Sequence, residues 1–494
     1  MKHAFLLLCG LALGPLTGLY CAPAAPGVPL APRDNEPTLS ENAALVVRFA
    51  HITDTHAIDT LSPARFTEAY VVTSSAWRPF EAYSMQLLDG IIRAVNRIHA
   101  GGRPIDFLLH TGDACDNAQT NESAWFLTVM DGGIVNPLSG PDDRSTEDKP
   151  AELLDPYAVF DAQGLYQKGR HGELDSIPWY FTFGNHDRYA VGVLPIFEDA
   201  SGRRSAPVPL PARPGLLLPT SLNPTSSRAA GRVTPADPGP PLLFERPLYV
   251  EPNDERAYSR KSEFAARLEN TVTGPASHGF AGVQNEDFWY SVIVAPRVRL
   301  IGLDTTDRSD PRPAEFCDEG ALSRRQLDFL RAELNRAAEN DELAIVATHH
   351  PSTSLNFASG SEVSGTEFRA ALNEYPNVVL HIAGHKHRNR VTDHNSYLEI
   401  ETCSTLDLPQ EGRLIELWRE PETDQIMIAY EMFSHLDDET PPLGPDPLQA
   451  LRAQAHAIAA GDKDAAARQR RFDPEDVDPR GRNRDRSGLI RLRR

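Results

Sequence analysis

The stretch LVVRFAHITDTH, residues 45–56, places two metal-binding residue types directly behind an apolar run. The run Leu45–Ile52 is rich in β-branched residues and predicts a buried strand. Asp54 and His56 follow it. In extended backbone, residues i and i+2 point the same way, so we expect both side chains to reach one ion. A lone Asp-x-His pair is commonplace, and this one gains weight only from similar segments further along the chain.

Four later segments repeat this arrangement of a ligand-type side chain behind an apolar run. The runs Phe107–His110, Trp179–Phe183, Leu343–Ala347 and Val378–Ile382 each predict a buried strand. In chain order, the five ligand segments are Asp54-Thr55-His56, Gly112-Asp113 with Asp116-Asn117, Gly184-Asn185-His186-Asp187, His349-His350-Pro351 and Gly384-His385-Lys386-His387. Each segment alone is equally well explained as a turn or a helix cap. Five in order predict one composite metal site.

Strands alternate with amphipathic helices along the chain, which predicts an α/β fold. Met85–Ile98 and Leu322–Leu334 carry apolar residues at helical spacing. Further strands are predicted at Trp289–Val294, Val298–Leu303, Tyr397–Glu401, Leu414–Leu417 and Ile426–Tyr430. Folds of this class gather ligand side chains at the carboxyl ends of their strands, which is where the five segments lie.

Two stretches differ from the rest of the chain. Residues 200–247 are rich in proline, arginine, serine and glycine and show no periodicity, which predicts a Pro-rich insertion of irregular loop. The insertion is either surface decoration or a lid over the site. Residues 445–494 are predicted to hold a helix at Leu448–Ile458 and, from Arg468 onward, a disordered basic tail.

The amino terminus is typical of an export signal spanning residues 1–24. A short basic start precedes the apolar run Ala4–Leu13, and Ala22-Pro23-Ala24 offers a small-x-small cleavage site. We therefore expect a periplasmic or secreted protein. Cys21 raises the alternative of a lipoprotein, which the bulky Tyr20 before it disfavours. No later apolar run is long enough to cross a membrane, so no transmembrane segment is expected after signal removal.

Charge and cysteine content limit the partners of the protein. A formal net charge of −20 over 494 residues disfavours general binding of nucleic acid, which is itself a polyanion. Three cysteines lie beyond the signal, at Cys115, Cys317 and Cys403. This odd number gives no readable disulfide framework, although a Cys317–Cys403 bridge is possible in an exported protein. The sequence leaves the oligomeric state open.

The ligand types fit hydrolysis of a phosphate ester. Two metal ions acidify a water and clamp the phosphate, and holding them takes roughly seven ligands with one carboxylate shared. Asn185 would supply a neutral oxygen ligand. His186 would stand beside the metals and protonate the leaving oxygen or stabilise the transition state, with Asp187 orienting its imidazole. Asp116 and Asn117 are predicted to cap the following helix or to support the site from behind.

Residues flanking the ligands are candidates for binding the substrate phosphate. Arg188, His350 and Lys386 are cationic or hydrogen-bonding neighbours of the ligand segments, and each is equally well explained as a solvent-facing residue. Asn185 and His186 complete the predicted substrate-binding set.

Together, the five segments resemble the calcineurin-like metallophosphoesterase superfamily, over roughly residues 45–435. Its members share Asp-x-His, Gly-Asp-x-x-Asp, Gly-Asn-His-Asp/Glu, a histidine–proline segment and Gly-His-x-His. The resemblance implies a four-layer α/β/β/α sandwich of two mixed sheets flanked by helices. It implies a first ion on Asp54, His56, Asp113 and His387, and a second on Asp113, Asn185, His349 and His385. Asp113 would bridge the ions, and His186 would be catalytic without being a ligand.

Other stretches are similar to a long bacterial subfamily of metallophosphoesterases. They are Ser62-Pro63-Ala64-Arg65, Arg78-Pro79, His278-Gly279-Phe280 and Gln410-Glu411-Gly412-Arg413-Leu414-Ile415-Glu416. Purple acid phosphatases have a tyrosine three residues after the bridging aspartate, where this chain has Asp116. That difference argues against a ferric–tyrosinate site.

The sequence thus predicts an exported, dinuclear-metal-dependent phosphoesterase acting on a small phosphomonoester or phosphodiester. A hydroxide bridging the two ions would attack in line, and His186 would assist the leaving group. Manganese, iron and zinc all suit mixed nitrogen and oxygen ligands. The alternative is a non-catalytic binding or scaffold module on the same fold, which is disfavoured because every expected ligand position is filled.

Overall fold

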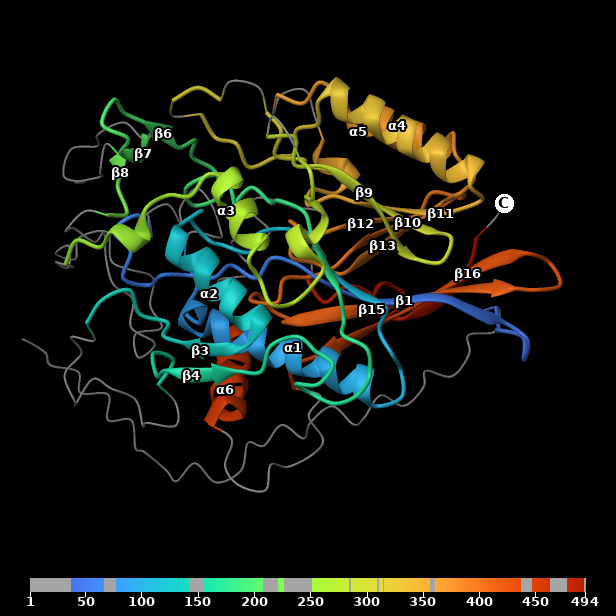
Figure 1. Cartoon of the computed structure of the whole chain (residues 1–494), viewed down its shortest axis with the longest axis horizontal. Helices are drawn as coiled ribbons and strands as arrows, with labels where there is room; N and C mark the ends of the chain where they lie inside the picture. Colours follow the sequence, from blue (N-terminus) through green and yellow to red (C-terminus); the bar gives the residue numbers. More distant parts are fainter. Residues whose placement is uncertain are drawn as a thin grey trace, which may run out of the picture. The chain divides into compact units, whose positions relative to one another are not determined.

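Two six-stranded sheets, each with parallel and antiparallel neighbours, form the centre of the computed structural model (Figure 1). The structure describes residues 37–65, 77–141, 155–207, 221–225, 251–283, 286–308, 311–313, 315–355, 360–436, 447–462 and 478–492. The predicted export signal and Cys21 lie outside this part of the chain. Within it, no helix has both the length and the apolar character needed to cross a membrane.

The first sheet brings three ligand-bearing strands side by side. Its strand order is β17 (Gly488–Arg491), β16 (Gln425–Ser434), β15 (Glu411–Glu420), β1 (Ala44–Ile52), β2 (Phe107–His110) and β5 (Trp179–Phe181). β1, β2 and β5 are parallel. Their carboxyl ends therefore meet at one edge, which places Asp54, Asp113 and Asn185 in neighbouring loops.

The second sheet does the same for the histidine segments. Its strand order is β13 (Arg390–Asp393), β14 (Leu398–Glu401), β12 (Val378–Ala383), β11 (Leu343–Ala347), β10 (Val298–Gly302) and β9 (Tyr290–Ala295). β10, β11, β12 and β14 are parallel. The loops after β11 and β12 carry His349 and His385.

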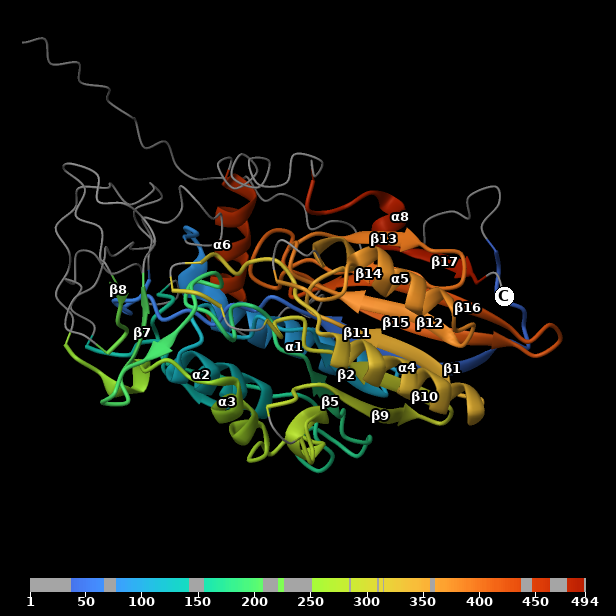
Figure 2. The same cartoon turned by 90° about the horizontal axis from the view of Figure 1, so that it is seen from above.

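The main hydrophobic core lies between the two sheets. It joins Phe49 and Leu108 of the first sheet to Leu300 and Ile345 of the second, as expected for sheets packed face to face. Helices cover the two outer faces (Figure 1): α1 (Ser84–Ala100), α2 (Thr120–Asp131) and α6 (Pro447–Gly461) on the side of the first sheet, α4 (Arg324–Glu339) and α5 (Gly365–Asn373) on the second. Figure 2 shows α4 and α5 from above, over the strands of the second sheet. The predicted four-layer α/β/β/α architecture is confirmed.

Smaller elements surround this sandwich. They are β3 (Gly133–Val135) paired with β4 (Phe160–Ala162), the small sheet of β6 (Phe197–Glu198), β7 (Arg204–Pro207) and β8 (Ser221–Leu222), the helices α3 (Lys261–Leu268) and α8 (Asn483–Arg486), and the 3-10 turns η3 (Glu81–Tyr83), η5 (Asp254–Arg256), η6 (Ala276–Gly279) and η7 (Ser352–Ser354). β7 and β8 fall inside the predicted Pro-rich insertion, most of which lies outside the described residues.

The carboxyl-terminal region departs from the prediction of a disordered tail. Gly488–Arg491 form β17, which pairs with β16 at the edge of the first sheet. Ile490 lies opposite Ile428, and Leu492 is buried. A short apolar run can complete an otherwise open sheet edge, and this run is too brief to stand out in an arginine-rich sequence. Cys115, Cys317 and Cys403 are buried free thiols, so the considered Cys317–Cys403 bridge is absent.

Candidate metal centre

Backbone hydrogen bonds join the loop after β1 to the loop after β2. The amide of Asp54 donates to the carbonyl of Gly112 at 3.0 Å, and the amide of His56 donates to the carbonyl of Asp113 at 2.9 Å. The parallel pairing of the two strands therefore continues into their loops. This pairing fixes Asp54 and His56 relative to Asp113.

Five of the seven predicted ligands have a left-handed backbone. The φ angles are 53° at Asp54, 48° at His56, 55° at Asp113, 67° at His385 and 49° at His387. Such a conformation costs a non-glycine residue about 1–3 kcal/mol and concentrates at functional sites. The expectation of extended backbone from Asp54 to His56 is thus wrong. Turns held by neighbouring loops, and not a strand pleat, aim these side chains.

Gly112 allows three ligand loops to approach one another. Its φ is 98°, and a Cβ at this position would lie 2.5 Å from the amide nitrogen of Gly184 and 2.9 Å from Nδ1 of His349. Only glycine combines that backbone angle with that proximity. Any side chain here would separate the loops after β2, β5 and β11.

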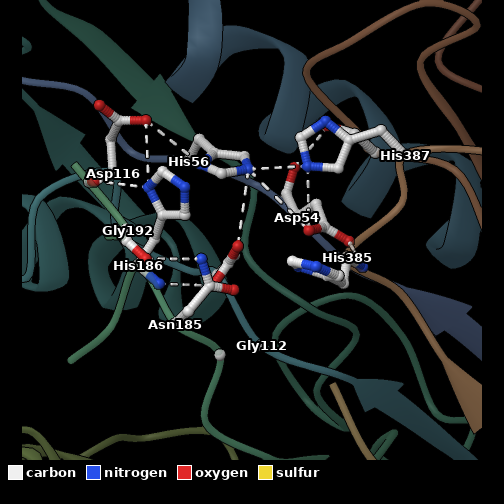
Figure 3. A network of polar contacts seen from close by, with 12 residues as sticks. Asp54, His56, Gly112, Asp116, Asn185, His186, Gly192, His385 and His387 are labelled. Atoms are coloured by element: carbon white, nitrogen blue, oxygen red, sulfur yellow. Dashed lines mark hydrogen bonds and ion pairs between the residues drawn. The ribbon is translucent and has the colours of Figure 1, made fainter. Parts of the chain in front are cut away.

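A first cluster of ligand atoms joins Asp54, His56 and His387 (Figure 3). Nε2 of His387 lies 3.1 Å from both Oδ1 of Asp54 and Nε2 of His56. Nε2 of His56 is 3.9 Å from Oδ1 of Asp54. The first two residues follow β1 and the third follows β12, so this cluster spans the two sheets.

A second cluster is centred on His349. Its Nε2 lies 3.0 Å from Oδ1 of Asn185 and 3.2 Å from Oδ2 of Asp113, and the ring of His385 is 5.3 Å away between centroids. Oδ2 of Asp113 is also 3.9 Å from Nε2 of His56 in the first cluster. Asp113 therefore stands between the clusters, where a shared ligand is needed.

The donor atoms suit two divalent ions. The ligand-type atoms fall into four groups whose members lie within 4.8 Å of one another: Asp54 with His56 and His387, Asp54 with Asp113 and His349, His56 with Asp113 and His186, and His349 with His350 and His385. Asn185 adds an amide oxygen, and manganese, iron and zinc accept such a mixture. Nε2 of His56 faces Nε2 of His387, an arrangement that a shared cation satisfies. The structure therefore brings the seven predicted ligands close together, and their division between two ions stays a prediction of the resemblance.

Buried carboxylates control the protonation of two of these histidines. Burial lowers the pKa of His349, but the charge and hydrogen bond of Asp113, the charge of Asp54 and the carbonyl of Thr111 together outweigh it and raise the pKa to about 9. Burial likewise opposes the charge of Asp54 at His387, whose pKa rises to about 10. Burial lowers the pKa of His56. Because a metal-bound imidazole nitrogen carries no proton, ion binding must displace protons from His349 and His387.

His186 lies beside the ligands with one nitrogen committed to the protein. Its ring centroid is 4.5 Å from that of His56, and its Nδ1 donates to the carbonyl of Asp116 at 2.7 Å. Oδ1 of Asp116 is 3.6 Å from the same nitrogen. A carbonyl acceptor fixes a proton on Nδ1, which leaves Nε2 for a substrate. Gly192 has no side chain to crowd Nε2, and a Cβ there would collide with it.

Asp187 does not orient His186, and that prediction is wrong. Its carboxylate accepts hydrogen bonds from the amides of Asp113 at 2.9 Å, Gly184 at 2.9 Å and Cys115 at 3.0 Å. Burial and the nearby charge of Asp113 raise the pKa of Asp187 to about 7. Asp187 instead ties the loop after β5 to the loop after β2.

Asp116 and Asn117 support the site and do not cap α2. Gln119 is the N-cap of that helix. Oδ1 of Asp116 lies 3.2 Å from Nδ1 of His56, on the side of the ring opposite the metal cluster (Figure 3). Oδ1 of Asn117 accepts from the amide of Val191 at 2.8 Å. Of the two predicted roles, support from behind is the one observed.

His350 has both ring nitrogens engaged by the protein. Nδ1 lies 2.8 Å from Oγ1 of Thr305, and Nε2 lies 3.2 Å from the carbonyl of Asp318. The prediction that His350 binds substrate is therefore wrong on this geometry. The guanidinium of Arg188 donates to the carbonyls of Thr306 and, at 3.3 Å, Arg308.

Sequence reasoning missed two charged residues behind the ligand histidines. Oδ2 of Asp407 accepts from Nδ1 of His387 at 2.6 Å, and Arg78 donates to the same carboxylate. Burial would raise the pKa of Asp407, but Arg78 and His387 hold it well below its ordinary value. Arg78 was noticed only as part of a subfamily resemblance. Asp407 lies in the loop between β14 and β15, whose sequence has no ligand pattern.

Comparison with known proteins supports the resemblance. Residues 47–234 match the family model described as calcineurin-like phosphoesterase, and no curated protein matches the chain. Among solved structures, the chain is similar to a dimetal phosphatase from Danio rerio (12% identity, covering 79% of this chain and 97% of that one, TM-score 0.40). It is also similar to a putative 5'-nucleotidase from Staphylococcus aureus (14% identity, covering 83% of this chain and 58% of that one, TM-score 0.35).

The matched segment contains four of the seven predicted ligands, Asp54, His56, Asp113 and Asn185, together with His186. The prediction of a metal-dependent phosphoric ester hydrolase is confirmed by this match. Residues 47–234 thus match the calcineurin-like phosphoesterases, a family whose members use a dinuclear centre of divalent metal ions.

Proposed function

We propose that the protein is an exported, dinuclear-metal-dependent phosphoesterase that hydrolyses a small phosphomonoester or phosphodiester. One observation carries this proposal: seven side chains from the loops after β1, β2, β5, β11 and β12 converge in two adjoining ligand clusters that share Asp113. Five of the seven side chains are buried, and five of the seven residues have a left-handed backbone, which a chance cluster of surface residues would not show.

The residues divide the work of hydrolysis between them. Asp54, His56, Asp113 and His387 would hold one ion, and Asp113, Asn185, His349 and His385 the other. Bound ions would supply an acidified water and neutralise the charge that develops on the phosphoryl oxygens. Nδ2 of Asn185 donates to the carbonyl of Gly192 at 2.9 Å, which turns the amide oxygen toward His349 and the cluster.

His186 is suited to protonate the leaving oxygen. Its Nδ1–H is held by the carbonyl of Asp116, so the proton that it gives to the substrate would be one carried on Nε2. A positioned imidazole of this kind contributes roughly 10²–10⁴ to the rate. The proton leaves Nε2, forms the O–H bond of the departing alcohol, and the neutral imidazole remains bonded to Asp116.

A substrate panel combined with metal reconstitution tests the proposal. The metal-stripped full chain would be loaded separately with manganese, iron or zinc, and its metal content measured by mass spectrometry. Mono- and diesters, including nucleoside monophosphates and cyclic nucleotides, would then be assayed. We expect two ions per chain and turnover of at least one ester class. Two bound ions without turnover of any ester would favour the non-catalytic scaffold, and substoichiometric metal would overturn the dinuclear site.

The export part of the proposal has its own measurement. Processing after Ala24 predicts a mature chain in the periplasm or medium that begins at Ala25. Mass spectrometry of the secreted amino terminus reads this directly. A lipid-modified chain beginning at Cys21 would replace secretion by membrane anchoring, and a full-length chain in the cytoplasm would refute export.

A further inference from the structure

Two ligand histidines of the first cluster are each backed by a carboxylate. Nε2 atoms of His56 and His387 lie 3.1 Å apart within the cluster. On the far side of the rings, Nδ1 of His56 is 3.2 Å from Asp116 and Nδ1 of His387 is 2.6 Å from Asp407. A carboxylate behind a ligand imidazole fixes its tautomer and orientation and increases its basicity.

Arg78 connects these two carboxylates. Its Nε donates to Asp407 at 2.8 and 3.0 Å, and its Nη1 lies 3.5 Å from Oδ1 of Asp116. The arginine is only 2% exposed. The chain of contacts therefore runs from His56 through Asp116, Arg78 and Asp407 to His387, and closes behind the cluster.

The three linking residues come from separate parts of the chain. Asp116 follows β2, Asp407 lies between β14 and β15, and Arg78 precedes η3. The residues next to Asp116 and Asp407 in the chain do not fix the distance between the two side chains. Without a cation between them, the two carboxylates would repel each other. A planar guanidinium is suited to hold both, because it offers several donors in a rigid fork.

The second cluster has no equivalent in the described residues. Nδ1 of His349 donates to the backbone carbonyl of Thr111 at 2.7 Å. That contact needs no side chain and no counter-charge. The two clusters therefore differ in how their histidines are supported, which makes a selective effect of Arg78 possible to detect.

We propose that Arg78 is a positioning residue for one of the two ions: by holding Asp116 and Asp407 together, it orients His56 and His387 for the first cluster and leaves the second cluster unaffected. This inference rests on the proposed dinuclear site and deepens it. Arg78 acts through the two aspartates and is not one of the proposed ligands. Removing a support of this kind typically costs 10–100-fold in metal affinity.

The test is a manganese titration of the full chain, comparing Arg78→Gln with the wild type. Calorimetry gives the two affinities, and electron paramagnetic resonance distinguishes a coupled manganese pair from a single ion. We expect Arg78→Gln to lower the affinity for one manganese ion by 10–100-fold and to leave the affinity for the other unchanged. The signal of the coupled pair should therefore disappear at limiting manganese. The affinity of Arg78→Lys for this ion should lie between those of the wild type and Arg78→Gln, because an ammonium group keeps the charge but cannot reproduce the forked donors of a guanidinium.

Arg299 provides a matched control. It is likewise buried, on β10, and bridges two carboxylates: its Nε donates to Glu342 at 2.7 Å and its Nη1 lies 3.3 Å from Glu333. Neither glutamate contacts the ligand residues. Arg299→Gln carries the same loss of a buried arginine and should keep both manganese affinities and the coupled signal.

The outcomes separate the two proposals. A wild-type protein that fails to bind two ions refutes the dinuclear site itself. A wild type with two ions and an Arg78→Gln variant with the same two affinities refutes the role of Arg78, as does equal weakening of both ions. If Arg78→Gln does not fold by circular dichroism, Arg78→Lys decides on the same criteria. If Arg299→Gln lowers the manganese affinity as much as Arg78→Gln does, the effect is a general destabilisation of the protein.

Discussion

The two sheets contribute different chemistry to the candidate centre. The loops of the first sheet supply all the oxygen ligands, Asp54, Asp113 and Asn185, and a single imidazole, His56. The loops of the second sheet supply imidazoles only, from His349, His385 and His387. Each ligand cluster nonetheless draws on both sheets. Neither sheet holds a complete ion site, so the centre exists only where the sandwich is assembled and the ions would bind the sheets together.

The substitution Asp113→Ala is expected to have the largest effect on the centre. Asp113 serves both clusters, so its loss should abolish turnover and remove metal from both positions, whereas His349→Ala on the second sheet should remove metal mainly from one. Metal content of both purified variants, with turnover on the best ester, measures the difference. Normal activity in Asp113→Ala would refute the bridging assignment. Equal loss of metal from the two variants would show that the ions bind only as a pair.

His186→Ala sharpens the comparison by separating metal binding from proton transfer. The imidazole stands beside the first-sheet ligands but donates to a backbone carbonyl and holds no ion in the proposed scheme. We expect the variant to keep both ions and to lose roughly 10²–10⁴ in kcat. The decrease in kcat should be smaller for an ester whose leaving group has a low pKa, because such a group departs without being protonated. A variant emptied of metal would instead make His186 a ligand.

The sequence predicted the strands and the convergence of the ligand segments because each segment follows a local apolar run. β2 and β11 begin and end at the residues expected from their apolar runs. The pairing of ligands around Asp113 came from the family resemblance and stays a prediction. What failed was backbone detail. Alternation predicted an extended Asp54–His56 segment, whereas contacts from the neighbouring loop impose left-handed turns.

The supporting residues could not be predicted, because their partners are distant in sequence. Arg78 and Asp407 are 329 positions apart and meet only when the loop between β14 and β15 packs over the site. Asp187 was predicted to orient the imidazole of His186, as in a base–orienter pair. Its carboxylate faces backbone amides instead. Local patterns reveal which residues bind metal, and the fold determines which residues hold them.

Asp187→Asn tests that revised role within the first sheet. The substitution weakens an acceptor of three buried backbone amides, so we expect the free energy of unfolding to fall by about 1–3 kcal/mol. Metal affinity should fall with it, because the amide of Asp113 is one of the three donors. Denaturant unfolding and metal titration measure both. Asp131→Asn is a control: Asp131 accepts from the amides of Val272 and Thr273, and the variant should lose stability only.

An Asp187→Asn variant with intact metal affinity and a selective loss in kcat would restore the original prediction that Asp187 serves His186. The outcome therefore decides between a loop tie and a catalytic orienter.

The smallest effect is expected at Arg188, which joins the two sheets without a metal. Arg188 follows β5 of the first sheet, and its guanidinium donates to carbonyls of Thr306 and Arg308, which follow β10 of the second. Arg188→Lys keeps the charge and loses the fork, so stability should fall by about 1 kcal/mol while KM stays within about twofold. Steady-state kinetics alongside denaturant unfolding gives both numbers. A tenfold rise in KM with unchanged stability would mean that the arginine turns from these carbonyls to the substrate phosphate. The sheets would then be joined at the centre by the ions alone.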